Sequence, residues 1–297
     1  MTLCVMNRTL SEPMSPSPQT SAEAPITIEI GGMPIALRTD DLEFRKMLTS
    51  RYAGFLKPGD STASSNPQFE FDIDLSNPAA SISPDDDVQV TLQGGQWLLQ
   101  RGDFQAQWAT RAGRGHVRQS CNPYAIDSVL RIVHSLILAQ QGGFLVHAAS
   151  AIRSGRAYLF AGVSGAGKTT IARLAPPDAK LLTDEISYVR REGDQYWAWG
   201  TPFAGELARV GENQSAPLSA LFLLEKGTEN HTEPVATGDA IRLMMRNILF
   251  FAQDNELVQK VFRSACEFVE RVPVRRLIFV PDERVWEIIP SSSERTL

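Results

Sequence analysis

Residues 156–173, RAYLFAGVSGAGKTTIAR, constrain the fold of this chain more than any other stretch. Residues 162–169 satisfy G-x-x-x-x-G-K-[ST], between an apolar segment typical of a buried strand and a short segment typical of a helix. In this pattern glycines let the backbone wrap phosphates, the lysine bridges the β and γ phosphates, and the next hydroxyl binds Mg²⁺. The stretch therefore predicts a strand, loop and helix that bind a nucleoside triphosphate with Mg²⁺. The predicted contact residues are Gly162, Val163, Ser164, Gly165, Ala166, Gly167, Lys168, Thr169 and Thr170, with Thr169 also a metal ligand.

An acidic pair follows this loop at a suggestive distance. The segment KLLTDE places Asp184 and Glu185 after a short apolar run, sixteen and seventeen residues beyond Lys168. One carboxylate at such a strand end holds the metal in P-loop NTPases, and a second permits a proton acceptor for an incoming hydroxyl. A solvated pair without chemistry is the alternative. The next residues, ISYVRREGDQYWAWG, predict a hairpin, whereas a standard NTPase would continue with a βαβ crossover.

Composition excludes several classes of partner. The chain has 297 residues, 43% of them hydrophobic and 21% charged, and its net charge of −5 provides no general basic field for nucleic acid or anionic lipid. Three scattered cysteines predict neither a disulfide framework nor a zinc site with paired ligands. No secretory segment or membrane-spanning apolar run is apparent, so we expect a cytoplasmic protein.

The first part of the chain predicts a leader and a β-rich region. Residues 1–24 are rich in Ser, Pro and Thr and predict a disordered leader. Residues 25–120 predict the β-rich N-terminal domain, with a hairpin around Gly31-Gly32 and a helix that ends before Pro58. Alternating apolar residues in the segments 69–75, 88–93, 96–100 and 104–110 predict an antiparallel, half-buried sheet.

Residues 121–297 predict the P-loop catalytic domain. Asn122 and Pro123 are typical of a helix start, and Gly142-Gly143 of its end, with His134 structural in its middle. Strands are predicted at 144–152, 156–162 and 218–226, with helices near 239–253 and 255–270. The element order predicts an α/β protein of the α+β kind with a mixed sheet.

These residues resemble the catalytic domain of HPr kinase/phosphorylase and its phosphoenolpyruvate-carboxykinase-like relatives. The resemblance rests on His147, the loop 162–169 and the Asp184-Glu185 pair, in that order, and it covers residues 142–225 well and 226–289 loosely. It implies a P-loop domain like the C-terminal domain of HPr kinase, preceded by a smaller β-rich region. A histidine on an apolar strand is by itself more often a core residue.

The resemblance also implies roles for individual residues. His147 would point into the phosphate site, and Asp184 would be the catalytic base that deprotonates a serine. Glu185 stands where the family usually has a second Asp, a Mg²⁺ ligand, and Glu206 in GTPFAGE is expected as a further acidic site residue. The Glu-Ile-Arg-Gly signature of the bifunctional enzymes is absent, so the chain looks more like the HPr-kinase-related peptide serine kinases of modified-peptide (lasso-peptide) clusters.

We therefore expect a kinase that uses ATP and Mg²⁺ to phosphorylate a serine of a peptide or small protein. A small-molecule kinase on the same scaffold and a non-catalytic nucleotide-binding regulatory module are the alternatives, and a homo-oligomer is left open. No nucleic-acid or membrane partner is expected. Arg271, Arg275 and Arg276 are candidates for a phosphate clamp, although cations at a helix end are usually solvated.

Overall fold

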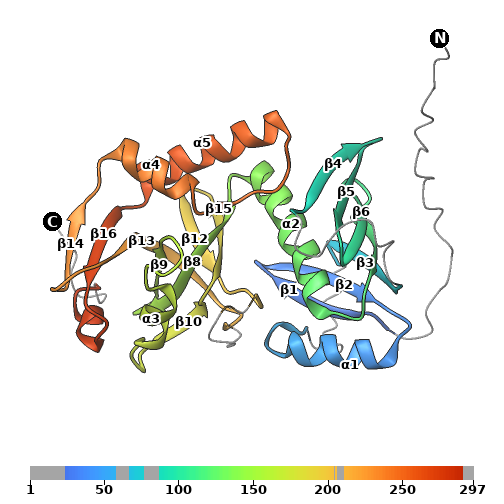
Figure 1. The fold of residues 1–297 in the computed structure, drawn as a ribbon, viewed down its shortest axis with the longest axis horizontal. Coiled ribbons are helices and arrows are strands. Elements are labelled where there is room, and N and C mark those ends of the chain that lie inside the picture. Colours follow the sequence, from blue (N-terminus) through green and yellow to red (C-terminus); the bar gives the residue numbers. More distant parts are fainter. Residues whose placement is uncertain (1–23, 58–66, 77–86, 204, 206–210, 290–297) are drawn as a thin grey trace, which may run out of the picture.

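The protein has a mixed α/β fold built on two mixed sheets with few helices (Figure 1). The computed structural model describes residues 24–57, 67–76, 87–203, 205 and 211–289. The predicted disordered leader therefore lies outside the described residues except for Ala24. Within the described part the sheets have seven and nine strands, and helix α2 lies between them (Figure 1).

The first sheet contains the strands β1 to β7, in the order β1-β2-β3-β7-β6-β5-β4. Their bounds are Ile26–Ile30, Met33–Arg38, Phe69–Leu75, Gln89–Gln93, Gln96–Arg101, Phe104–Ala109 and Arg114–Gln119. The β1–β2 hairpin turns at Gly31-Gly32 as predicted, with Ile30 opposite Met33.

The prediction of an antiparallel sheet is wrong for β3, which pairs in parallel with both β2 and β7. Helix α1 (Leu42–Arg51) lies in the connection between β2 and β3 and permits the parallel crossover. The antiparallel meander β4 to β7 then returns the chain to the free side of β3. Helix α1 ends at Arg51, earlier than predicted, and a 3-10 turn at Ala53–Phe55 follows.

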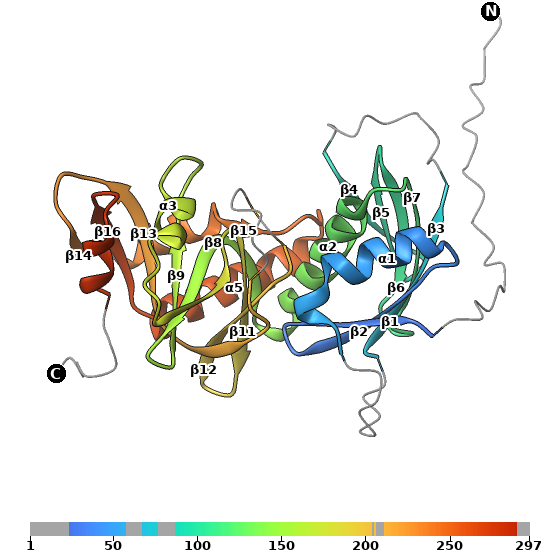
Figure 2. The same ribbon diagram turned by 90° about the horizontal axis from the view of Figure 1, so that it is seen from below.

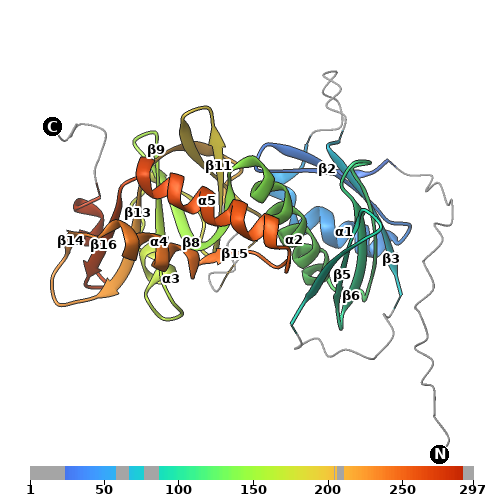
Figure 3. The same ribbon diagram turned by 90° about the horizontal axis from the view of Figure 1, so that it is seen from above.

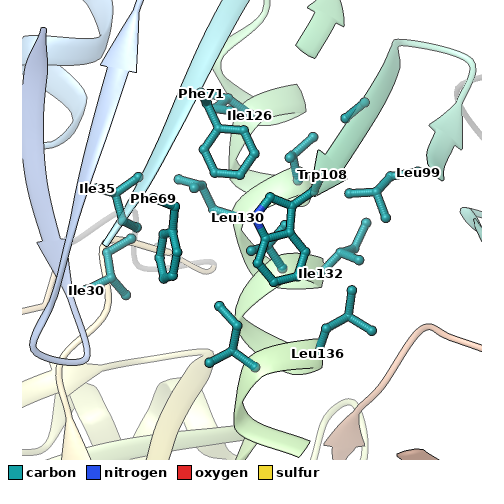
Figure 4. Packing of buried hydrophobic residues seen from close by; sticks show 14 of the residues in the cluster. Ile30, Ile35, Phe69, Phe71, Leu99, Trp108, Ile126, Leu130, Ile132 and Leu136 are labelled. Atoms are coloured by element: carbon teal, nitrogen blue, oxygen red, sulfur yellow. The ribbon is translucent and has the colours of Figure 1, made fainter. Parts of the chain in front are cut away.

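Helix α2 (Pro123–Gln141) is the shared centre of the molecule. The Asn122 side chain accepts the N–H of Tyr124 at 2.9 Å, and Gly142 ends the helix in the left-handed conformation, both as predicted. Ile126, Leu130 and Leu136 lie in one hydrophobic cluster with Phe69, Phe71 and Trp108 of the first sheet (Figure 4). The same cluster includes three side chains of the second sheet, Leu145, Ile186 and Tyr188. Contact with both sheets explains why most positions of this helix are buried.

The second sheet contains the strands β8 to β16, with a main order β10-β8-β11-β12-β13-β16-β14. The strand β9 pairs with β8 and β13, and the short strand β15 pairs with β8. Their bounds are Phe144–Arg153, Arg156–Ala161, Ala179–Thr183, Ile186–Glu192, Gln195–Trp199, Ser215–Lys226, His231–Pro234, Ile248–Leu249 and Val274–Phe279. The mixed sheet predicted from the sequence is therefore present, with parallel pairing of β9, β13 and β16.

Helices cover both faces of the second sheet (Figures 2 and 3). Alternate residues of its strands separate into two cores: Ala149, Phe160 and Phe222 pack with α3 (Lys168–Arg173), and Val146 and Leu159 pack with α4 and α5. Helix α4 (Thr237–Met245) ends earlier than predicted, because β15 follows it, whereas α5 (Asn255–Arg271) has nearly its predicted length. A 3-10 turn at Glu283–Glu287 follows β16.

The predicted division at residue 121 stays a prediction, since α2 packs on both sheets. Cys121 and Cys266 are free thiols. Among the described residues, no helix combines the length and the apolar character needed to cross a membrane.

Candidate functional site

The phosphate-binding motif forms the connection between β9 and α3. Residues 162–167 make the loop, and α3 begins at Lys168, as the sequence predicts. Gly167 has φ +111°, and a Cβ at this position would lie 2.6 Å from the Phe279 ring at the end of β16. This glycine is therefore required both by backbone conformation and by the close approach of β16.

Lys168 lies against the start of its own loop. Its side chain is buried, and Nζ donates to the carbonyl oxygens of Gly162 at 2.8 Å and Val163 at 3.3 Å. Thr169 and Thr170 are half-buried on the first turn of α3, whereas Val163 is 70% exposed. The ammonium group is thus held over the loop, where the motif expects the β and γ phosphates.

The acidic pair forms a sharp break between two strands. Asp184 and Glu185 lie between the end of β10 and the start of β11, and both strands pair with β8. Thr183 Oγ1 accepts the N–H groups of Glu185 at 3.2 Å and Ile186 at 3.3 Å, which fixes the turn. Asp184 is 3% exposed, and its Oδ1 accepts the N–H of Gly205 at 2.9 Å.

Strand register brings the loop and the acidic turn to the same level of β8. Ala161, the last residue before the loop, pairs with Ala148. On the other side of β8, Thr183 pairs with Ser150 and Ile186 with His147, so Asp184 and Glu185 run beside the same residues. Because adjacent strands lie 4.7–4.9 Å apart, the two backbones are about 10 Å apart here, with β8 between them.

His147 belongs to the same constellation. Alternation along β8 gives it the same face as Leu145, which packs in the cluster around α2, and Ala149, which packs with α3. Its backbone N–H donates to the carbonyl of Asn247 at 2.7 Å. Partial burial, together with the positive charges of Lys168 and Arg131, lowers the pKa of His147 below its ordinary value of 6.5. The neutral imidazole therefore predominates at pH 7, and in that form one ring nitrogen donates and the other accepts.

Arg131 is a site neighbour that the sequence analysis misses. It is the one lysine or arginine within α2, and its guanidinium carbon lies 4.9 Å from the centroid of the Phe203 ring. Burial lowers the pKa of Arg131, and the charges of Asp127 and Glu185 act in the opposite direction. A lone basic residue in the middle of a mostly apolar helix is the signal that could have identified it from sequence.

The arginines considered for a phosphate clamp lie elsewhere. Arg271 contacts Asp194 in the β11–β12 turn, Arg275 donates to Thr232, and Arg276 pairs with Glu225. All three are exposed or half-buried residues that contact surface groups, so the expectation of solvated cations holds for them. Glu206 lies outside the described residues.

A family model fits this part of the molecule. The model of the SynChlorMet cassette protein ScmC matches residues 119–291, more than half of the chain. The chain belongs to the ScmC family. The ScmC match includes α2, the loop 162–167 and the acidic turn, and leaves out almost all of the first sheet.

Other comparisons add little to the ScmC assignment. No curated protein matches the chain. Among solved structures, the Hpr(Ser) kinase/phosphatase from Coxiella burnetii aligns at 11% identity over 48% of this chain and 90% of that chain, with a TM-score of 0.26. A likeness at that TM-score carries no argument. The resemblance of this ScmC protein to HPr-kinase-related peptide serine kinases therefore stays a prediction.

The side chains around the loop suit a magnesium nucleotide. Thr169, Asp184 and Glu185 offer only oxygen donors, which Mg²⁺ prefers, and Lys168 offers a point charge for phosphate. Within the described ranges, no three His, Cys, Asp or Glu side chains form a group that could hold a metal ion. Mg²⁺ at nucleotide sites takes one or two carboxylates and completes its shell with phosphate oxygens and water.

Proposed function

We propose that this protein is an ATP- and Mg²⁺-dependent kinase that transfers the γ-phosphate to a serine hydroxyl of a peptide or small protein. One observation carries the proposal: the Lys168 loop, the Asp184-Glu185 turn and His147 meet around the middle of β8. A phosphate-binding loop and a buried carboxylate on the two sides of one strand supply the groups that phosphoryl transfer to a hydroxyl needs.

Each residue has a proposed task in this reaction. The loop N–H groups and Lys168 hold the phosphates, and Thr169 and Glu185 would hold Mg²⁺, which neutralises charge on the phosphate oxygens. The bond from γ-phosphorus to the β–γ bridging oxygen breaks as the bond to the serine oxygen forms. The hydroxyl proton passes to Asp184, and ADP leaves.

Two features support the assignment of base and hydrogen-bond partner. The N–H of Gly205 fixes Asp184 Oδ1 at 2.9 Å, so the carboxylate is held in one orientation for a hydroxyl. His147, neutral because of its burial and the two nearby cations, has an N–H to donate to a phosphate oxygen without adding a third positive charge.

A transfer assay tests the proposal. It follows label from γ-labelled ATP, in the presence of Mg²⁺, to host peptides, and mass spectrometry locates the product. We expect Asp184→Asn to bind ATP normally but to transfer about 10²- to 10⁴-fold more slowly, since it lacks the proton acceptor. Lys168→Ala is expected to lose ATP binding itself. Wild-type transfer rates in Asp184→Asn would contradict the assignment of the base.

The acceptor class is decided by the same assay. Label on a serine-containing metabolite but on no peptide would favour a small-molecule kinase on this scaffold. Clear ATP binding without transfer to any acceptor would favour a non-catalytic nucleotide-binding module.

A further inference from the structure

Arg131 brings a positive charge to the site, and among the described residues it forms no hydrogen bond or ion pair. Its Nε atom is fully buried. Arginine stays protonated in proteins, and even the partial burial of a cation without a hydrogen-bond partner is costly; Arg131 is half-buried. The contact with the Phe203 ring compensates only part of that cost.

The obvious partner for Arg131 is already occupied. Asp127 lies one helical turn earlier, at the spacing where an acid and a base on α2 normally pair. Its Oδ1 accepts the hydroxyl of Tyr52 at 2.5 Å, and its Oδ2 accepts Arg51 Nε at 3.0 Å and Arg51 Nη2. Residues from the end of α1 thus neutralise the carboxylate that would otherwise hold Arg131.

Arg131 also lies beside the groups of the proposed reaction, because its guanidinium packs on Phe203, two residues before the Gly205 N–H that Asp184 accepts. Its charge acts on His147, as does that of Lys168, and the charge of Glu185 acts on Arg131. Lys168 and Arg131 therefore put two cations on one histidine, an arrangement that a bound anion would stabilise. A planar guanidinium suits the paired oxygens of a phosphoryl group.

We infer that Arg131 is a phosphoryl-binding residue, whose guanidinium contacts oxygens of the phosphoryl group on the side of the site formed by α2. This inference rests on the proposed function for its ligand. The phosphoryl group has two sources: the γ-phosphate of the bound nucleotide, or the phosphate on the acceptor side after ADP has formed. Tyr52, Arg51 and Asp127 then keep Arg131 available for it.

Binding measurements on the full chain test the inference independently of transfer. Calorimetry compares wild type, Arg131→Met and Arg131→Lys with three probes. The probes are a non-hydrolysable ATP analogue with Mg²⁺, ADP with Mg²⁺, and inorganic phosphate added to Mg²⁺ and ADP. Arg275→Met on β16 is the matched control, since it removes an exposed arginine whose Nε donates to Thr232 Oγ1.

We expect the loss of affinity in Arg131→Met to be confined to probes that carry the contacted phosphate. If Arg131 contacts the γ-phosphate, Arg131→Met should weaken binding of the ATP analogue about 10- to 100-fold and change ADP binding little. If the contact is on the acceptor side, the variant should weaken only the binding of inorganic phosphate. The affinity of Arg131→Lys should lie between those of wild type and Arg131→Met, because lysine keeps the charge but cannot make two parallel hydrogen bonds to phosphate oxygens as a guanidinium does. The thermal midpoint of Arg131→Met should equal or exceed that of wild type, since a half-buried cation without an ion-pair partner among the described residues is removed.

Three results would overturn the inference. One is unchanged binding of all three probes in Arg131→Met, and another is an equal loss for ATP analogue and ADP with a lowered thermal midpoint, which marks a structural role. The third is a wild type that binds none of the probes. Absence of transfer in the wild type, with the phosphate-selective loss still present in Arg131→Met, would reject the proposed kinase activity and leave this inference standing.

Discussion

His147 titrates in the field of two cations, which makes its pKa a sensor of the site's geometry. Burial comes first among the causes that lower this pKa, followed by Lys168 and Arg131. Removing either cation leaves the burial and should raise the pKa of His147 toward 6.5. NMR titration of the ring protons in wild type, Arg131→Met and Lys168→Met measures this, with exposed His231 on β14 as internal reference. Superimposable His147 curves would show that the cations lie too far away to matter.

His134 predicts a different pH effect, on stability. It is fully buried between Phe69 and Tyr188, with ring centroids 5.9 and 5.4 Å away, and burial lowers its pKa to about 3. The unfolded chain takes up the proton near pH 6.5 whereas the folded chain does so only near 3. As the pH falls from 6.5 toward 3, the free energy of unfolding should therefore decrease by about 1.4 kcal/mol per pH unit.

The variant His134→Leu removes this titration while keeping a buried side chain of similar volume. Urea unfolding at pH 7, 6, 5 and 4 should show that wild type loses stability faster than His134→Leu below pH 6.5, because every other group titrates alike in both. Parallel curves for the two proteins would mean that His134 is not neutral and buried in solution.

At the scale of elements, local sequence signals predicted many helix and strand boundaries correctly, but they did not predict which strands pair over long distances in the sequence. The caps of α2, the Gly31-Gly32 hairpin and the strand–loop–helix around Lys168 follow from neighbouring residues, and the structure has them. The parallel pairs of β3 depend on strands far apart in sequence, which alternation cannot assign. The break at Asp184 depends on the Thr183 hydroxyl, and apolar patterning does not register it.

The site shows the same division between local and distant information. The sequence alone predicted the phosphate-binding motif and the order of His147 and Asp184. Strand β8 brings these three features together in the structure. Arg131 was missed because its relation to them comes from the packing of α2 on β8.

The loop at Gly205 allows a test of how the acidic turn is held. A Cβ at Gly205 would lie 2.8 Å from Glu185 Cβ and 3.0 Å from Asp184 Oδ2, so Gly205→Ala should displace the N–H that Asp184 accepts. We expect transfer to slow roughly 10- to 100-fold with ATP affinity retained, since charged hydrogen bonds are worth about 1.5–3 kcal/mol. Gly238→Ala on α4, where a Cβ meets open space, is the matched control. Equal rates in both variants would contradict this view of the turn.

At the scale of the whole molecule, α2 makes the two sheets share one hydrophobic core. Trp108 of the first sheet and Tyr188 of the second both pack in the cluster around this helix, and both are buried. Helix α1 contributes the Arg51 and Tyr52 contacts to Asp127 on the same helix. The first sheet therefore supports the helix that presents Arg131, although it lies almost wholly outside the ScmC match.

This shared core predicts that residues 121–297 will not fold to full stability without the first sheet. Separated from it, α2 would expose Ile126 and Leu130, which are fully buried in the whole chain, at a cost of about 25 cal/mol for each Å² of apolar surface. We expect the full chain to unfold in one transition by calorimetry, and the fragment to be insoluble or to melt at least about 10 °C lower. Trp108→Ala in the full chain, which opens a cavity against α2, should lower the single midpoint and keep the transition single. A fragment that melts at the full-chain temperature would instead show that α2 is stabilised by the second sheet alone, and that the division at residue 121 separates independent domains.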